Sequence, residues 1–207
     1  MEMETGAAKE HYFSKNPGSR HRNALINCVL RNKNYIFLTD ASTFSRAKID
    51  TGTKVLAKCM KINRSDVVLD LGCGYGPIGI VAAVLAEDGK CYMVDINRRA
   101  ARLAEKNVKL NNIKNAEVRS GNMFEPLDGL RFDVILTNPP INAGRKLVLA
   151  FIENSYGHLK REGRFYLVVR TKQGAKTIRE IMKGIFGNAE YASIHSGYRV
   201  IMSSREE

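Results

Sequence analysis

From residue 66 onward, short apolar runs alternate with stretches that have the pattern of helices. Strands are expected over residues 66–71, 90–95, 116–120, 132–137, 164–169, 189–194 and 198–203. Helices are expected over residues 77–86, 97–111, 145–158 and 173–186, the first of them opened by Pro77. This alternation is typical of an α/β fold with a doubly wound, mostly parallel sheet.

Both ends of the chain depart from this alternation. Only His195, Ser196 and Gly197 join the last two expected strands, which is too short for a parallel crossover, so an antiparallel hairpin is expected there. Near the other end, the apolar runs at 24–30 and 35–40 flank a short Asn-bearing turn and predict a second β-hairpin, followed by a loop and a helix over 53–60. We expect residues 1–50 to form an arm and hairpin packed on one domain of residues 51–207.

Composition limits the class of protein. The chain has 207 residues, 44% of them hydrophobic, which fits a soluble globular domain of ordinary size. No stretch approaches the roughly 20 apolar residues that span a bilayer, and the polar start of the chain does not resemble a secretory signal. The net charge of +12 favours a polyanionic partner such as nucleic acid, although a generally basic proteome would give the same charge.

The four cysteines indicate neither a metal site nor a disulfide framework. Cys28, Cys59, Cys73 and Cys91 contain no CxxC pair and no histidine cluster accompanies them, so no metal is expected. We interpret them as reduced thiols in a cytoplasmic protein.

A glycine-rich turn, DLGCGYGPIG at 70–79, follows the first strand of the expected sheet. Glycines there let the backbone turn tightly and approach a ligand, at the carboxyl end of the strands where such sheets bind ligands. Asp95 ends the next strand, 19 residues after Gly76, where a carboxylate can bind the two hydroxyls of a ribose. A cofactor that carries a nucleoside is therefore expected.

Two cofactors remain open on this motif. Residues 74–79 match the dinucleotide fingerprint G-x-G-x-x-G, which allows NAD and an oxidoreductase. The match begins three residues past the strand, however, and Asp70 at the strand tip would repel a pyrophosphate but attract a cation. S-adenosylmethionine carries an ammonium and a sulfonium and no phosphate, so Asp70 favours it.

The fourth expected strand ends in TNPPI at 137–141, beside the glycine-rich turn. Two successive prolines remove two N–H donors, which leaves the Asn138 amide oxygen and the Pro139 carbonyl as hydrogen-bond acceptors. Such acceptors suit an exocyclic or carboxamide amine, which they would hold facing a methyl group while positive charge develops on its nitrogen. The motif taken alone would be a loop breaker.

The motifs DLGCGYG at 70–76, VDIN at 94–97 and TNPP at 137–140 resemble, in this order and spacing, those of class I S-adenosylmethionine-dependent methyltransferases that methylate nitrogen. HYFS at 11–14 and FLTDASTFSRAKIDTGTKVL at 37–56 resemble the small-methyltransferase-domain family, which includes ribosomal RNA guanine-N2 methyltransferases and small archaeal and bacterial relatives. The resemblance covers residues 11–203. It implies a Rossmann-like, mostly parallel seven-stranded sheet with a C-terminal antiparallel hairpin and an N-terminal β-hairpin extension.

The resemblance also implies site residues. The cofactor would be bound by Phe44, Thr51, Gly52, Thr53, Asp70, Gly72, Cys73, Gly74, Asp95, Ile96, Asn122, Met123 and Asn138. The target amine would be held by Asn138, Pro139 and Pro140. The family motif usually continues with Tyr or Phe, whose ring stacks on the base, where this chain has Ile141. Either another aromatic, Tyr12, Phe13 or Tyr75, supplies the stacking, or the base is held differently.

The expected activity is methyl transfer from S-adenosylmethionine to an exocyclic amine, guanine N2 of ribosomal RNA or of a ribosomal subunit. A protein glutamine carboxamide is an alternative target, and a NAD-dependent oxidoreductase or a non-catalytic RNA-binding protein are alternatives of other classes. Residues 145–183 hold ten Lys and Arg against three Glu, and Lys172 and Lys176 are the candidates for phosphate contacts. We expect no membrane partner, and a monomer or weak dimer.

Overall fold

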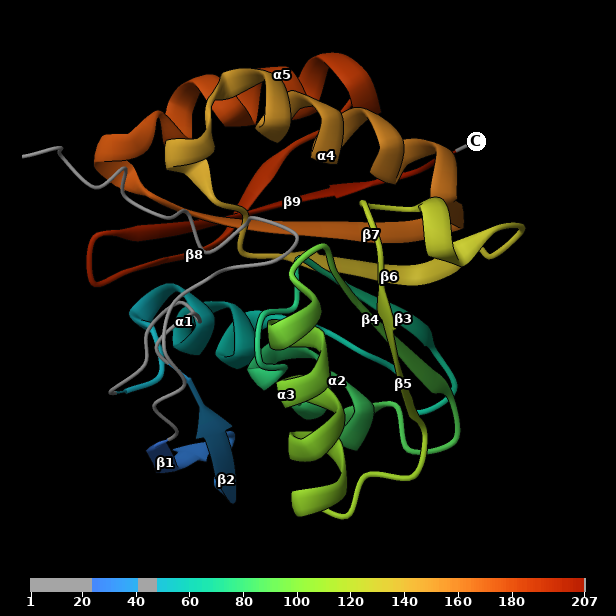
Figure 1. Cartoon of the computed structure of the whole chain (residues 1–207). Helices are drawn as coiled ribbons and strands as arrows, with labels where there is room; N and C mark the ends of the chain where they lie inside the picture. Colours follow the sequence, from blue (N-terminus) through green and yellow to red (C-terminus); the bar gives the residue numbers. More distant parts are fainter. Residues whose placement is uncertain (1–23, 41–47, 207) are drawn as a thin grey trace, which may run out of the picture.

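A computed structural model of the chain describes residues 24–40 and 48–206. Its centre is a seven-stranded sheet in the order β5-β4-β3-β6-β7-β9-β8 (Figure 1). The strands are β3 (Val67–Leu71), β4 (Lys90–Asp95), β5 (Ala116–Ser120), β6 (Phe132–Thr137), β7 (Leu159–Arg170), β8 (Glu190–His195) and β9 (Tyr198–Ser204). Strands β3 to β7 are parallel, whereas β9 pairs antiparallel with both β7 and β8. The predicted parallel sheet and C-terminal antiparallel hairpin are confirmed.

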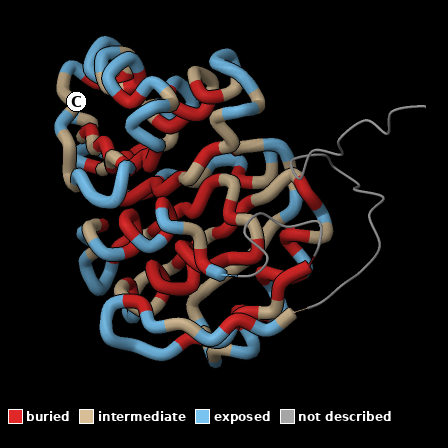
Figure 2. The backbone as a smooth tube through the Cα atoms, turned by 90° about the vertical axis from the view of Figure 1, so that its left-hand side faces the viewer, coloured by how far each residue is buried: buried red, intermediate tan, exposed pale blue. Residues whose placement is uncertain are grey.

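Helices cover both faces of this sheet (Figure 1). They are α1 (Thr51–Cys59), α2 (Pro77–Leu85), α3 (Arg98–Leu110), α4 (Arg145–His158) and α5 (Ala175–Phe186), with short 3-10 turns η1 (Glu125–Leu127), η2 (Ile141–Ala143) and η3 (Thr171–Gln173). One apolar cluster joins α1, α2 and α3 to the sheet, and a second joins α4 and α5 to its other face. Buried residues therefore fill the middle of the molecule, and the outer layers are more exposed (Figure 2).

Strand β7 is longer than its sequence suggests. It begins at Leu159 rather than residue 164, because fully buried Leu159 pairs with Phe132 before a register shift in β6. The polar residues that follow Leu159 hid this first part of the strand. There, Glu162 adopts a φ of 62°, and its N–H and the Gly163 carbonyl both bond to the backbone of Arg205.

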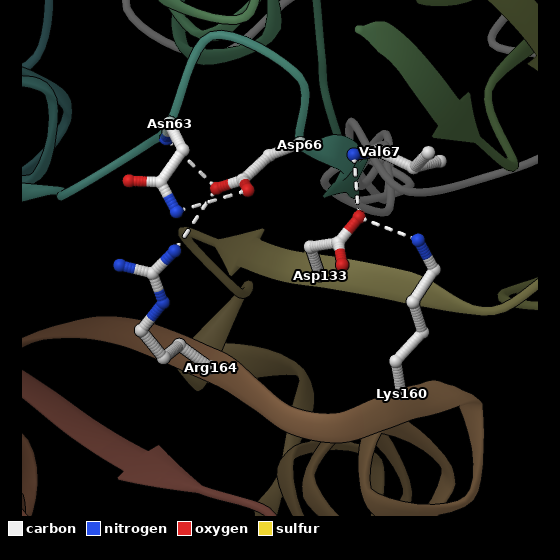
Figure 3. Close-up of polar contacts among 6 residues, drawn as sticks. All are labelled: Asn63, Asp66, Val67, Asp133, Lys160 and Arg164. Atoms are coloured by element: carbon white, nitrogen blue, oxygen red, sulfur yellow. Dashed lines mark hydrogen bonds and ion pairs between the residues drawn. The ribbon is translucent and has the colours of Figure 1, made fainter.

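Two aspartates fasten three strands at the end of the sheet opposite the glycine-rich turn (Figure 3). Asp66 accepts hydrogen bonds from the backbone N–H and side-chain amide of Asn63, and from Arg164 Nη2 at 2.9 Å. Asp133 accepts from the Val67 N–H and from Lys160 Nζ, both at 2.7 Å. These contacts hold β3, β6 and β7 in register at one end, which fixes where the other ends of the same strands lie.

The predicted N-terminal hairpin is present as β1 (Ala24–Leu30) and β2 (Lys33–Thr39). Arg31 and Asn32 form its turn, both at positive φ, as a two-residue hairpin turn requires. Asn107 of α3 and Asn111, which directly follows the helix, occupy the outer edge of β2: Asn111 bonds to the N–H and C=O of Ile36, and Asn107 to those of Leu38. The second amide hydrogen of Asn107 reaches the Tyr75 carbonyl in the glycine-rich turn, so one buried side chain joins the hairpin to that turn.

We expect Asn107→Ala to lower the free energy of unfolding by about 3 kcal/mol, because it leaves the Leu38 N–H and two carbonyls without their partner in a buried place. Urea unfolding followed by circular dichroism measures this loss. Asn154→Ala is the matched control, since Asn154 is exposed on α4 and bonds only within its own helix; its cost should stay below about 0.5 kcal/mol. Equal losses in the two variants would contradict the assigned role of Asn107.

Candidate active site

Two adjoining cavities open at the carboxyl ends of the parallel strands. The first has a volume of about 280 Å³ and lies against the glycine-rich turn and the ends of β4 and β6. The second, of about 250 Å³, lies between the end of β6, the end of β7 and the start of β9. Asp50, Asn138 and Pro139 line both and so form their common wall.

The glycine-rich turn is built around strand β4. The N–H groups of Gly72 and Cys73 both donate to the Val94 carbonyl, and Gly74 donates to Asp95 Oδ2 at 2.8 Å. Gly74 has a φ of 57°, a backbone conformation that residues with a Cβ rarely adopt. At Gly72 and Gly74 the turn therefore brings bare backbone up to the first cavity.

Asp95 combines a structural and a candidate binding role. Its two carboxylate oxygens each accept one backbone N–H, from Gly74 and from Asn97, both at 2.8 Å. Each oxygen keeps acceptor capacity beyond that bond, and the residue lines the first cavity. Burial raises the pKa of Asp95 to about 6, partly offset by the two N–H groups. A hydroxyl donor arriving from the cavity would find a fixed carboxylate.

Asp70 lies behind the turn instead of lining either cavity. Its side chain is buried, with Oδ2 accepting from the Gly79 N–H at 2.7 Å and Oδ1 without a hydrogen-bond partner in the described part of the chain. Burial raises the pKa of Asp70 to about 7, and the neighbouring Asp95 charge adds to this. The expectation that Asp70 attracts the cationic end of a cofactor stays a prediction. Any such attraction would act across the glycine-rich turn, which lies between Asp70 and the first cavity.

The raised pKa of Asp70 predicts how the stability of the ligand-free protein depends on pH. Its pKa is higher in the folded than in the unfolded chain, so its stabilising contribution is complete below about pH 4 and is lost as pH rises through about 7. We expect Asp70→Asn to gain stability over the wild type by on the order of 2 kcal/mol between pH 5 and pH 8. Urea unfolding at several pH values measures the difference; a difference that does not change with pH would contradict the burial argument.

The end of β6 presents the NPP motif at the common wall. Asn138 Nδ2 donates to Asp50 Oδ2 at 3.1 Å and to Thr53 Oγ1 at 3.2 Å, which engages both amide hydrogens and leaves Oδ1 as the available polar atom. The Pro139 carbonyl already accepts from the Ile141 N–H at 2.9 Å and keeps one further lone pair. The motif thus offers acceptors and no donors to a ligand between the cavities.

The second cavity has an aromatic wall that the sequence did not reveal. Tyr198, at the start of β9, donates its hydroxyl to Asp50 Oδ1 at 3.3 Å and accepts from Arg170 Nε at 2.9 Å. The Arg170 guanidinium also lies 5.3 Å from the centre of the Tyr198 ring. Asp50 and Tyr198 are 148 positions apart, and the only local signal was that Asp directly before TGT fits the N-cap of a helix.

The structure brings most predicted site residues together. Those that line the first cavity are Thr53, Gly72, Cys73, Gly74, Asp95, Ile96, Asn122, Met123, Asn138, Pro139 and Pro140. Ile141 lines the second cavity. Thr51 is exposed at the start of α1, and Gly52 is buried against the Tyr198 ring, so neither lines a cavity. Lys172 and Lys176 are exposed and line neither.

Three of the predicted residues, Tyr12, Phe13 and Phe44, lie outside the described residues. Tyr75, the other aromatic considered for base stacking, is only 4% exposed and packs edge-on against Phe37 at 5.9 Å; it lines the first cavity and not the second. Among described residues, Tyr198 is the aromatic that lines the second cavity.

The described residues contain no group of three or more His, Cys, Asp and Glu placed to hold a metal ion. Within 24–40 and 48–206, no helix has the length and apolar character needed to cross a bilayer.

Comparison with known proteins gives concordant matches. The profile of the family "Methyltransferase small domain" matches residues 34–202. Uncharacterized protein YbxB of Bacillus subtilis (strain 168) is 35% identical over 198 residues, which cover 95% of this chain and 98% of YbxB. Ribosomal RNA small subunit methyltransferase C of Haemophilus influenzae (strain 86-028NP) is 30% identical over 161 residues, 76% of this chain and 47% of that protein.

Among solved structures, the T. thermophilus 16S rRNA N2 G1207 methyltransferase (RsmC), in complex with AdoMet and guanosine, superposes with a TM-score of 0.80 at 22% identity. The match covers 88% of this chain and 50% of that one. The chain thus spans nearly all of YbxB but about half the length of these ribosomal RNA methyltransferases.

Proposed function

This chain belongs to the methyltransferase small domain family, and on that premise we propose that it transfers a methyl group from S-adenosylmethionine to guanine N2 of ribosomal RNA. The predicted family, its Rossmann-like fold and the methyltransferase class are confirmed, which removes the NAD-dependent oxidoreductase alternative. The target base and RNA are the proposed part.

The first cavity has the features that S-adenosylmethionine needs. Leu71, Val94, Ile96, Met123 and Phe151 give it a largely apolar lining, suited to an adenine ring. Asp95 would accept hydrogen bonds from the ribose hydroxyls, and the amide oxygen of Asn122, which lines the same cavity, would accept one from the adenine amine. When bound there, S-adenosylmethionine supplies an electrophilic methyl group on a positively charged sulfur.

One observation carries the proposed reaction: Asn138 has both amide hydrogens engaged, so its Oδ1 remains for an acceptor amine at the junction of the cavities. Asn138 Oδ1 and the Pro139 carbonyl would orient the amine and stabilise positive charge on its nitrogen. That nitrogen would take up the methyl group, and the electron pair of the broken carbon–sulfur bond would stay on sulfur. The methylated nitrogen then loses a proton to solvent, so no strong base is needed.

An RNA partner is supported by charge and position. The chain carries a net charge of +12, and Arg170 reaches the second cavity with exposed Lys172 and Lys176 two and six positions further along the chain. The curated relatives named for ribosomal RNA methylation point the same way. A cytoplasmic location and a monomer or weak dimer stay predictions.

The test is transfer of labelled methyl from S-adenosylmethionine into two pools, undermodified ribosomal RNA or subunits and a protein extract. We expect label in RNA, and nuclease digestion should recover it as N2-methylguanosine. S-adenosylhomocysteine in excess should suppress the signal. Label in protein alone would overturn the RNA assignment in favour of a side-chain amide, and label in another nucleoside would overturn guanine.

A further inference from the structure

Asp50 lies where its carboxylate could contact the base that accepts the methyl group. It is half-buried at the N-terminus of α1 and lines both cavities. Oδ2 accepts from the Thr53 N–H at 3.2 Å and from Asn138 Nδ2 at 3.1 Å. Within the described part of the chain, Oδ1 accepts a single hydrogen bond, from the Tyr198 hydroxyl at 3.3 Å. The two oxygens of Asp50 therefore have different hydrogen-bond partners and can have different roles.

Oδ2 fixes the direction of the Asn138 amide. If that amide were turned over, its oxygen would meet the Asp50 carboxylate, which repels it, and would lose the donor bond to Thr53 Oγ1. The carboxylate thus keeps Asn138 Oδ1, and not the NH2 group, facing the acceptor.

Oδ1 is itself held in place from the other side. Arg170 Nε donates to the Tyr198 hydroxyl at 2.9 Å, so the phenolic hydrogen is directed to Asp50. This bond uses only part of the acceptor capacity of Oδ1, and Asp50 lines the second cavity. A base placed there would meet a fixed carboxylate oxygen beside the Asn138 oxygen.

Two neighbouring acceptors select a base edge that carries two neighbouring donors. Guanine presents N1–H next to its exocyclic N2 amine, whereas adenine and cytosine present an unprotonated ring nitrogen next to theirs. A ring nitrogen facing Asp50 would place a lone pair against a carboxylate, which is repulsive.

We propose that Asp50 is the specificity-determining residue of the acceptor site: its Oδ1 receives the N1–H of guanine while Asn138 receives the N2 amine. The assignment rests on the proposed function. Tyr198 and Arg170 act through Asp50 and are positioning residues.

The isosteric variant Asp50→Asn tests this reading. Asn is as good an N-cap as Asp, so α1 should form, and its oxygen can keep the bonds to Thr53 and Asn138. Its NH2 group then replaces Oδ1 and turns an acceptor into a donor. The probes are guanosine 5′-monophosphate and 2-aminopurine riboside 5′-monophosphate, which both carry the 2-amine but differ in that 2-aminopurine lacks O6 and has no hydrogen on N1.

Dissociation constants are measured for the full chain saturated with S-adenosylhomocysteine, from 2-aminopurine fluorescence and its displacement by guanosine monophosphate. We expect the wild type to prefer guanosine monophosphate by about tenfold or more, and Asp50→Asn to reduce that ratio by about tenfold or reverse it. Asp128→Asn, which changes an exposed carboxylate outside both cavities, should keep the wild-type ratio.

Equal weakening of both probes in Asp50→Asn, with an unchanged ratio, would overturn the assignment and reduce Asp50 to holding Asn138. A wild type without preference would overturn it as well. Failure of the proposed function has a different signature, namely no label in RNA. In that case a guanine preference that is lost in Asp50→Asn would still support Asp50 as the residue that reads N1–H.

Discussion

Asn138→Ala is expected to lower kcat for methyl transfer by about 100- to 1000-fold, the usual effect of removing one group that stabilises charge in a transition state. Positive charge grows on the acceptor nitrogen as the new bond forms, and Asn138 Oδ1 is the neutral acceptor that the bonds to Asp50 and Thr53 leave for it. Asn138 also lines the cofactor cavity, so the dissociation constant of S-adenosylmethionine should rise too, but by no more than about tenfold, far less than the rate falls.

Single-turnover transfer of labelled methyl measures the rate, and isothermal titration calorimetry measures the cofactor. Asn142→Ala is the matched control: Asn142 lines the second cavity, is exposed and bonds to Gln173, so its loss should change the rate by less than about fivefold. A comparable loss in both variants, or a normal rate in Asn138→Ala, would rule out the assigned role of Asn138.

The largest expected effect on cofactor affinity belongs to Asp95→Asn. We expect the dissociation constant of S-adenosylmethionine to rise by about 100-fold, because two hydrogen bonds from ribose hydroxyls to a charged acceptor would be weakened or lost. The Gly74 N–H and the Asn97 N–H also compete for the one remaining oxygen, so the glycine-rich turn is held less well.

Isothermal titration calorimetry at pH 8, where wild-type Asp95 is ionised, gives the affinities. Asp128→Asn again serves as the carboxylate control and should bind as the wild type does. The free energy of unfolding of Asp95→Asn, measured in parallel, separates a lost contact from a lost fold. Wild-type affinity in a folded Asp95→Asn variant would exclude the ribose assignment.

The fold was predictable because its signals are local. Residues 132–137 are an almost continuous apolar run, and in the structure the same residues form buried β6. Helix α3 shows the same agreement, since its polar face, and the Asn97 cap that accepts from Arg99 and Ala100, are both written in consecutive residues. The start of β7 was missed because residues 160–163 show no apolar pattern. They are held by backbone bonds of Glu162 and Gly163 and by the ion pair of Lys160 with Asp133.

The candidate site was predictable only where a motif is contiguous. Asn138 and Asp95 follow strands whose carboxyl ends share one edge, so their neighbourhood could be inferred. Asp50 and Tyr198 meet because β9 pairs antiparallel with β7. The hairpin of β8 and β9 was predicted from its short connection, but no short-range pattern records that β9 lies next to β7. The division at residue 50 stays a prediction, but Asp50 itself takes part in both the start of α1 and the site.

The insertion of β9 next to β7 also has a consequence for the growing chain on the ribosome. Every described residue that lines the first cavity lies between Asp50 and Phe151, whereas the second cavity also needs Arg170 and, last of all, Tyr198. Synthesis proceeds from the N-terminus, so a nascent chain carries all the residues of its cofactor cavity before it carries the wall against which an acceptor would rest. A chain arrested before its final strand would resemble a cofactor-binding protein without an acceptor site.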